Sequence, residues 1–111
     1  MTKTLVERRS HPRHALAVEI ETSSEQQPGH LARMTTHDLS MGGLYCSSTA
    51  DFPEMTRLAV RLMLPEPLEV EAVVVRRRAL PSLGAPRFEL ALYFPWLSPD
   101  QRNRLGRFLE S

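Results

Sequence analysis

Three stretches in the second half of the chain alternate apolar residues with mostly polar ones. They cover residues 57–64, 68–76 and 87–94, and turn-forming residues separate them. Successive side chains of a strand point to opposite faces, so this period of two predicts three strands that each bury one face. The buried faces are expected to consist of Leu58, Val60, Leu62 and Leu64, of Leu68, Val70, Ala72 and Val74, and of Phe88, Leu90, Leu92 and Phe94.

Three further strands are predicted in the first half of the chain. Residues 14–22 alternate clearly, residues 31–39 alternate weakly and are rich in Thr, and residues 44–48 are typical of extended structure. The apolar face of the first of these strands is formed by Leu16, Val18 and Ile20. Residues 23–30 contain a Pro-Gly pair and are predicted to form a loop.

The period changes at the carboxyl end, where a helix is expected. Ser98 fits the N-cap, Pro99 the first helical position, and Gln101 completes a capping box. The apolar stripe of this helix consists of Leu105, Phe108 and Leu109. Gly106 costs a helix about 1 kcal/mol relative to Ala, so the helix is expected to dock on the rest of the protein.

Six short strands followed by one helix indicate an all-β fold, a six-stranded antiparallel β-barrel with a C-terminal α-helix packed on it. The length of 111 residues suits a single domain. We divide it into a flexible N-terminal arm over residues 1–13, the barrel over residues 14–96 and the helix over residues 97–111.

Composition limits the classes of function. The net charge of +1 gives no general attraction to nucleic acid, and with one Cys the chain forms no internal disulfide. No signal peptide and no apolar run of membrane-spanning length is present in the sequence. These features predict a cytoplasmic domain without membrane insertion.

A basic segment, ERRSHPRH, lies directly before the first predicted strand. Its Arg9 and Arg13 are four residues apart, and Pro12 disfavours helix at the residue before it. A guanidinium group can donate two parallel hydrogen bonds to phosphate oxygens and can stack on rings. Two such groups on an extended arm can therefore cover a flat anionic ligand. The alternative is a solvated basic arm without a ligand.

A second segment, HDLSMGG, follows the second predicted strand. Asp38 and Ser40 are two residues apart, so in a strand they would project from the same face. A carboxylate can accept two hydrogen bonds from the N1–H and N2–H edge of guanine, and a hydroxyl beside it can donate or accept. Gly42 and Gly43 allow a turn or the close approach of a ligand. The alternative is a local turn closed by the Asp or Ser side chain.

Together, R-x-x-x-R before the first strand and D-x-S-x-x-G after the second resemble the PilZ domain family. The order of the motifs, the chain length, the small barrel and the terminal helix agree with that family from Glu7 to the end. The resemblance implies a bacterial receptor for cyclic di-GMP that is not an enzyme and uses no cofactor. One departure is Ala91, which stands where many members have a glycine in the last strand.

The resemblance also implies roles for individual residues. Arg9 and Arg13 would clamp the guanine and phosphate, Asp38 and Ser40 would read the base, and Gly43 would allow close approach. An arginine at the position of Arg8 accompanies binding of two stacked ligands in some members, so one or two molecules per chain are expected. Ligand binding is expected to order the arm and create a surface for an effector protein.

The arginine run, the histidines and the single cysteine are interpreted separately. The run Arg76–Arg78 is interpreted as a solvated strand end, with extra phosphate contact as the functional alternative. The four His residues lack metal-site spacing, and Cys46 is interpreted as a half-buried thiol rather than a nucleophile. Three other functions stay open: a PilZ-like interaction module that does not bind nucleotide, a barrel that binds single-stranded nucleic acid through aromatic platforms, and an enzyme of unknown type.

Overall fold

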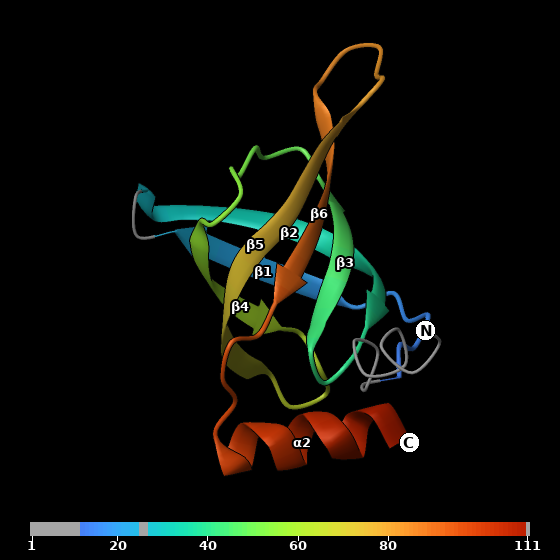
Figure 1. Ribbon diagram of the computed structural model, residues 1–111, viewed down its shortest axis with the longest axis vertical. Helices are drawn as coiled ribbons and strands as arrows, with labels where there is room; N and C mark the ends of the chain where they lie inside the picture. Colours follow the sequence, from blue (N-terminus) through green and yellow to red (C-terminus); the bar gives the residue numbers. More distant parts are fainter. Residues whose placement is uncertain (1–11, 25–26, 111) are drawn as a thin grey trace, which may run out of the picture.

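The computed structural model describes residues 12–24 and 27–110 (Figure 1). Within them the chain forms a closed antiparallel barrel whose strands are ordered β1-β2-β3-β6-β5-β4, with one helix below it. The elements are β1 Glu19–Ser24, β2 Gln27–Leu39, β3 Gly43–Ser48, β4 Arg57–Leu62, β5 Leu68–Leu80, β6 Arg87–Tyr93 and α2 Pro99–Glu110. The predicted six-stranded barrel with a terminal helix is therefore confirmed.

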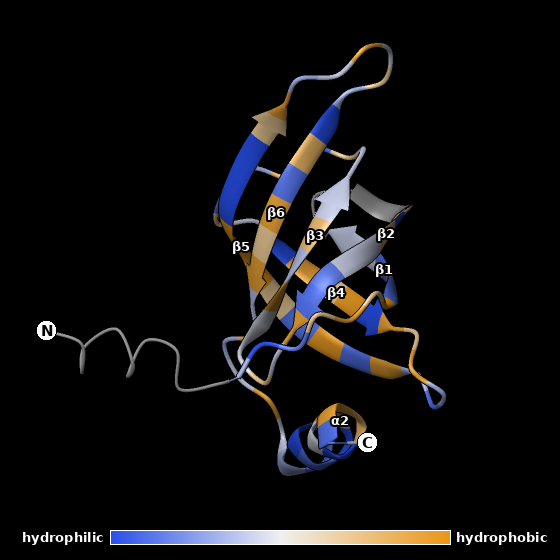
Figure 2. Cartoon of the chain, turned by 90° about the vertical axis from the view of Figure 1, so that its right-hand side faces the viewer, coloured by the Kyte–Doolittle hydropathy of each residue, from blue (hydrophilic) through white to orange (hydrophobic). Residues whose placement is uncertain are grey.

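The barrel interior is built from the predicted alternation. Every residue expected on the inner faces of β4, β5 and β6 is buried, and the apolar bands alternate with polar ones along these strands (Figure 2). Each buried Leu, Val or Phe contributes about 1.5–3 kcal/mol through burial of its apolar surface. The inner faces therefore hold the barrel closed, which leaves the outer faces free to carry function.

The amino-terminal half differs from the sequence-based prediction. β1 begins at Glu19, and residues 14–18 instead run beside the end of β2, where His14 bridges Leu39. The predicted loop over residues 23–30 is wrong, because β2 already begins at Gln27, which pairs with Ser24. The register between β1 and β2 shifts between Thr22 and Ser24. Pro28 of β2 has no backbone N–H to donate, and a proline is tolerated at such an irregularity.

The fifth strand is longer than predicted. β5 continues through the three arginines to Leu80, so Arg76–Arg78 lie inside a strand rather than at its end. Together with β6 it forms a hairpin that projects beyond the barrel (Figure 1). Its pairing with β6 shifts register between Val74 and Arg76, which marks a β-bulge.

The terminal helix has the predicted cap. The Gln101 N–H donates to Ser98 Oγ at 3.1 Å, and the Ser98 N–H donates to Gln101 Oε1 at 2.7 Å. Leu105 and Leu109 are buried, and Arg104 donates to the carbonyl of Pro67 at 2.8 Å, which ties α2 to the chain before β5. Within the described residues, no helix is long and apolar enough to cross a membrane.

Candidate ligand-binding cleft

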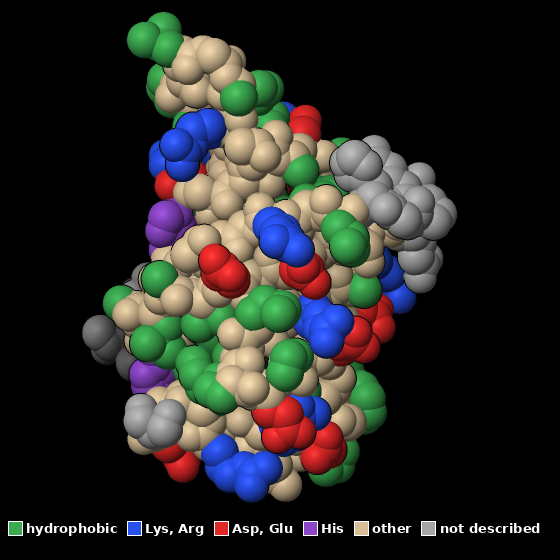
Figure 3. All heavy atoms as spheres, turned by 180° about the vertical axis from the view of Figure 1, so that it is seen from behind, with side chains coloured by type: hydrophobic (Ala, Val, Ile, Leu, Met, Phe, Trp, Pro, Cys, Tyr) green, Lys and Arg blue, Asp and Glu red, His purple; other side chains and the backbone are tan. Residues whose placement is uncertain are grey.

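A cleft of about 740 Å³ lies on the outer surface of the barrel, where β2, β3, β6 and β5 are neighbours. Its lining includes Arg13, Asp38, Ser40 and Gly43, so four of the six predicted site residues meet at one place. The other two, Arg8 and Arg9, lie outside the described residues. On the back of the molecule, cationic and acidic side chains are mixed over the surface (Figure 3).

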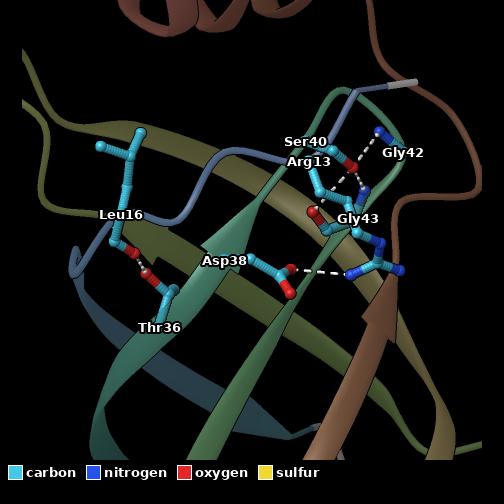
Figure 4. A network of polar contacts seen from close by, with 7 residues as sticks. All are labelled: Arg13, Leu16, Thr36, Asp38, Ser40, Gly42 and Gly43. Carbon is cyan, nitrogen blue, oxygen red and sulfur yellow. Dashed lines mark hydrogen bonds and ion pairs between the residues drawn. The ribbon is translucent and has the colours of Figure 1, made fainter.

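Arg13 is held at the cleft by the segment that follows it. His14 and Leu39 exchange two backbone hydrogen bonds of 3.0 Å. Further along, Thr36 Oγ1 donates to the Leu16 carbonyl at 2.6 Å (Figure 4). The same hydroxyl accepts from the Val18 N–H at 2.9 Å. These contacts fix the chain after Arg13 against β2.

Arg13 and Asp38, which are 25 residues apart in sequence, form an ion pair in the cleft. Arg13 Nη1 donates to Asp38 Oδ1 at 2.7 Å (Figure 4). The Arg13 side chain is 55% exposed and that of Asp38 25%, so both groups remain accessible to a ligand. The guanidinium has four further N–H donors, and a carboxylate has further lone pairs, so the pair leaves capacity for more hydrogen bonds.

Asp38 faces the cleft because of an irregularity in β2. Thr36 and Leu39 are both buried, and the register with β3 shifts between Thr36 and Asp38. A bulge adds one residue to a strand and changes which face the next side chain takes. His37 is consequently exposed and Asp38 partly exposed, side by side on the outer surface.

Asp38 and Ser40 were expected to project from the same face of a strand. They do not, because β2 ends at Leu39 and Ser40 lies in the turn. Its hydroxyl is buried in the turn, where it accepts from the N–H groups of Gly42 and Gly43 at 3.1 and 3.2 Å. The same hydroxyl donates to the Gly43 carbonyl at 3.2 Å (Figure 4). Ser40 therefore closes the turn that forms one end of the cleft.

Gly43 is required by the packing of the barrel. A Cβ atom at this position would lie 2.0 Å from the Leu92 carbonyl oxygen of β6, a distance that no real contact tolerates. The close approach at Gly43 is thus to the neighbouring strand. Gly43 also lines the cleft.

Tyr45 and Ala91 form the floor of the cleft. They are register partners on β3 and β6, and Asp38 is the partner of Tyr45 on the other side. Glu89 near the Tyr45 hydroxyl raises the pKa of the tyrosine, both as a hydrogen-bond acceptor and through its negative charge, and Glu89 is also paired with Arg78. Tyr45 therefore lies beside the small side chain of Ala91.

Tyr45 was missed by the analysis of the sequence, which singled out only its neighbours in the motif. No local pattern distinguishes it from any other strand residue, because its place depends on the pairing of four strands. Cys46, the next residue, points inward and is fully buried, and burial raises the pKa of its thiol to about 12. Such a thiol is protonated at neutral pH and is a poor nucleophile.

Two of the three arginines of β5 are engaged by acidic side chains. Arg77 forms a two-pronged pair with Asp51 and lies over the Phe88 ring at 4.9 Å, while Arg78 pairs with Glu89. Arg76 lies in the cleft. Within the described part of the chain, no group of His, Cys, Asp and Glu is arranged to hold a metal ion.

The sequence and the fold both match one known protein family. The family model for the PilZ domain matches residues 7–111. The chain belongs to the PilZ domain family. A search of the curated proteins finds no match.

Solved structures with the same fold confirm the architecture. The PilZ domain with c-di-GMP of YcgR from Escherichia coli superposes with a TM-score of 0.73 and 18% identity, covering 93% of this chain and 90% of that one. The PilZ domain of CeSA from a cellulose synthesizing bacterium gives 0.65 and 23%, covering 90% and 99%. The Bacillus subtilis inhibitor of motility, MotI/DgrA, gives 0.72 and 21%, covering 93% of this chain but only 50% of that one.

Proposed function

We propose that this chain is a receptor for cyclic di-GMP and that the ligand binds in the cleft lined by Arg13 and Asp38. The observation that carries the proposal is that Arg13 of the first motif meets Asp38, Ser40 and Gly43 of the second in one cleft, in a member of the PilZ family. A related domain of this fold, that of YcgR, is described as a complex with c-di-GMP.

The chemistry of the cleft suits a guanine dinucleotide. Asp38 can accept the paired N–H donors of a guanine edge, and Arg13 can bind a phosphate or stack on a base. The ligand does not have to break the Arg13–Asp38 pair, because each group retains hydrogen-bonding capacity. Ser40 and Gly43 then contribute by fixing the turn beside Asp38.

Residues 1–13 supply the remaining contacts of the proposal. Arg9 lies four residues before Arg13, so it would close over the ligand from the same segment. Arg8 would contact a second ligand molecule where two bind per chain. Ordering about eight residues costs several kcal/mol, so an affinity near micromolar is expected.

We extend the proposal to signalling. The segment fixed over the ligand would form a new surface, which an effector protein would recognise, in a cytoplasmic receptor that catalyses no reaction. Hydrogen exchange of residues 1–13 is expected to slow when cyclic di-GMP saturates the protein. Exchange rates that do not change on saturation would contradict this step without affecting the binding proposal.

A calorimetric titration tests the binding proposal. The wild type should bind cyclic di-GMP saturably, and neither GTP nor cyclic di-AMP should compete. Arg9→Ala, Arg13→Ala and Asp38→Ala should lose at least ~10-fold in affinity, the range expected for a lost charge-assisted contact. Arg61→Ala, which removes an exposed arginine of β4 far from the cleft, is the matched control and should bind as the wild type does.

Absence of heat and of a thermal shift at high micromolar ligand would contradict the proposal. The chain would then be a PilZ fold that serves as an interaction module without nucleotide. A stoichiometry of two ligands per chain, lost in Arg8→Ala, would assign Arg8 its role.

A further inference from the structure

We infer that Arg76 is a second phosphate-binding residue of this cleft, which gives the cleft a cationic side opposite Arg13. The inference rests on the proposed function and goes beyond it, because Arg76 belongs to neither sequence motif. It also gives Arg76 a role that the two arginines that follow it in β5 do not share.

A β-bulge in β5 turns Arg76 to the outer surface. Val70, Ala72 and Val74 are buried in alternation, so an uninterrupted strand would turn Arg76 into the core. The register with β6 shifts between Val74 and Arg76, and both Val75 and Arg76 are exposed. Bulges next to binding sites commonly redirect a side chain in this way.

The same device acts on the opposite side of the cleft. The bulge in β2 brings Asp38 to the outer surface, and the bulge in β5 brings Arg76 there. Asp38, Tyr45, Ala91 and Arg76 are then successive register partners across β2, β3, β6 and β5. Two separate irregularities thus place charged groups at the two ends of one row.

The charge of Arg76 is available to a ligand. Asp51 engages Arg77 and Glu89 engages Arg78, whereas no described carboxylate forms an ion pair with Arg76. Glu89 and burial raise the pKa of Tyr45, and the positive charge of Arg76 acts in the opposite direction, so Arg76 lies near the tyrosine hydroxyl. A cation that lines a cleft without a carboxylate partner is suited to bind an anionic group of a ligand.

The spacing across the cleft places Arg13 and Arg76 on opposite sides of it. Three interstrand distances of about 4.8 Å separate the backbones of Asp38 and Arg76, about 14 Å in all. Arg13 is paired with Asp38 at one end, and Arg76 lies at the other, above the small floor residue Ala91. A cyclic dinucleotide carries two phosphates, so a cleft with a cation on each side matches a ligand with two separate charges.

Titration of Arg76 variants with cyclic di-GMP tests the inference. Arg76→Ala should weaken binding about 10-fold and make the affinity less dependent on salt, because one charge contact is lost. Arg76→Lys should retain part of the affinity, and Arg76→Glu should lose more than Arg76→Ala. Arg61→Ala, which removes the same charge from an exposed site on β4, should bind within twofold of the wild type at every salt concentration.

The thermal unfolding midpoint of Arg76→Ala should equal that of the wild type, which excludes a structural cause. If Arg76→Ala binds like the wild type while Arg13→Ala loses affinity, the inference is wrong and the proposed function stands. If the wild type itself does not bind cyclic di-GMP, both are wrong.

Discussion

Two parts of the cleft differ in how their polar groups are satisfied. Ser40 and Gly43 at the two ends of the turn are buried, and the hydroxyl, N–H and carbonyl groups of the turn bond to one another without a ligand. The rim, formed by Arg13, Asp38 and Arg76, is exposed or partly exposed and keeps unused donors and acceptors. The turn is therefore a frame that the fold itself requires, and the rim is the part that is open to solvent and that the proposed ligand would contact.

This difference shows that one short motif combines two physical tasks. Asp38 belongs to the rim, whereas Ser40 and Gly43 belong to the frame. Substitutions in the frame should change the free energy of unfolding and, through it, binding. Substitutions in the rim should change binding while the free energy of unfolding stays nearly constant.

The largest effect on stability is expected for Gly43→Ala. The added Cβ would meet the Leu92 carbonyl oxygen, so β3 and β6 must separate at a cost of about 3 kcal/mol or more. Urea denaturation followed by circular dichroism measures this loss. Gly106→Ala is the matched control, because its Cβ would reach only Met41 Sδ at 3.9 Å and should stabilise the helix by up to about 1 kcal/mol.

A smaller loss is expected for Ser40→Ala. The N–H groups of Gly42 and Gly43 would lose their acceptor in the turn, at a cost of about 1–3 kcal/mol. The same denaturation experiment applies, and Ser40→Thr should recover part of the loss because it restores the hydroxyl. A variant Ser40→Ala as stable as the wild type but unable to bind ligand would move Ser40 from the frame to the rim.

The smallest effect on stability is expected for Asp38→Asn. The Arg13–Asp38 pair is partly exposed, and such pairs contribute at most about 1 kcal/mol. Binding of cyclic di-GMP should nevertheless fall at least ~10-fold, because the charged acceptor for the guanine edge is lost. A large drop in the unfolding midpoint of this variant would break the distinction between rim and frame.

The sequence was sufficient to predict the parts of the fold that depend on local pattern. The inner faces of β4 to β6 follow from alternation, and the cap of α2 follows from Ser98 and Gln101. The motif residues Arg13 and Asp38 were predicted to act together, and the structure places them in contact.

What the sequence could not supply is the register between strands. The row from Asp38 through Tyr45 and Ala91 to Arg76 depends on bulges in β2 and β5, and a bulge has no reliable local signal. A simple period of two would bury both Asp38 and Arg76. The start of β2 at Gln27 was missed for a similar reason. A Pro-Gly pair usually indicates a turn, but here it lies within β2, in the part where the register with β1 shifts.

The central claim is that ligand occupies the outer surface of β2, β3, β6 and β5 between Arg13 and Arg76. Amide chemical shifts recorded by NMR during titration with cyclic di-GMP test this claim directly. We predict large, saturable shifts for Asp38, Tyr45, Ala91 and Arg76, with Ile20 and Leu62 on the far side of the barrel nearly unchanged. Shifts that gather on β1 and β4 or along α2, with the cleft residues unchanged, would contradict the account.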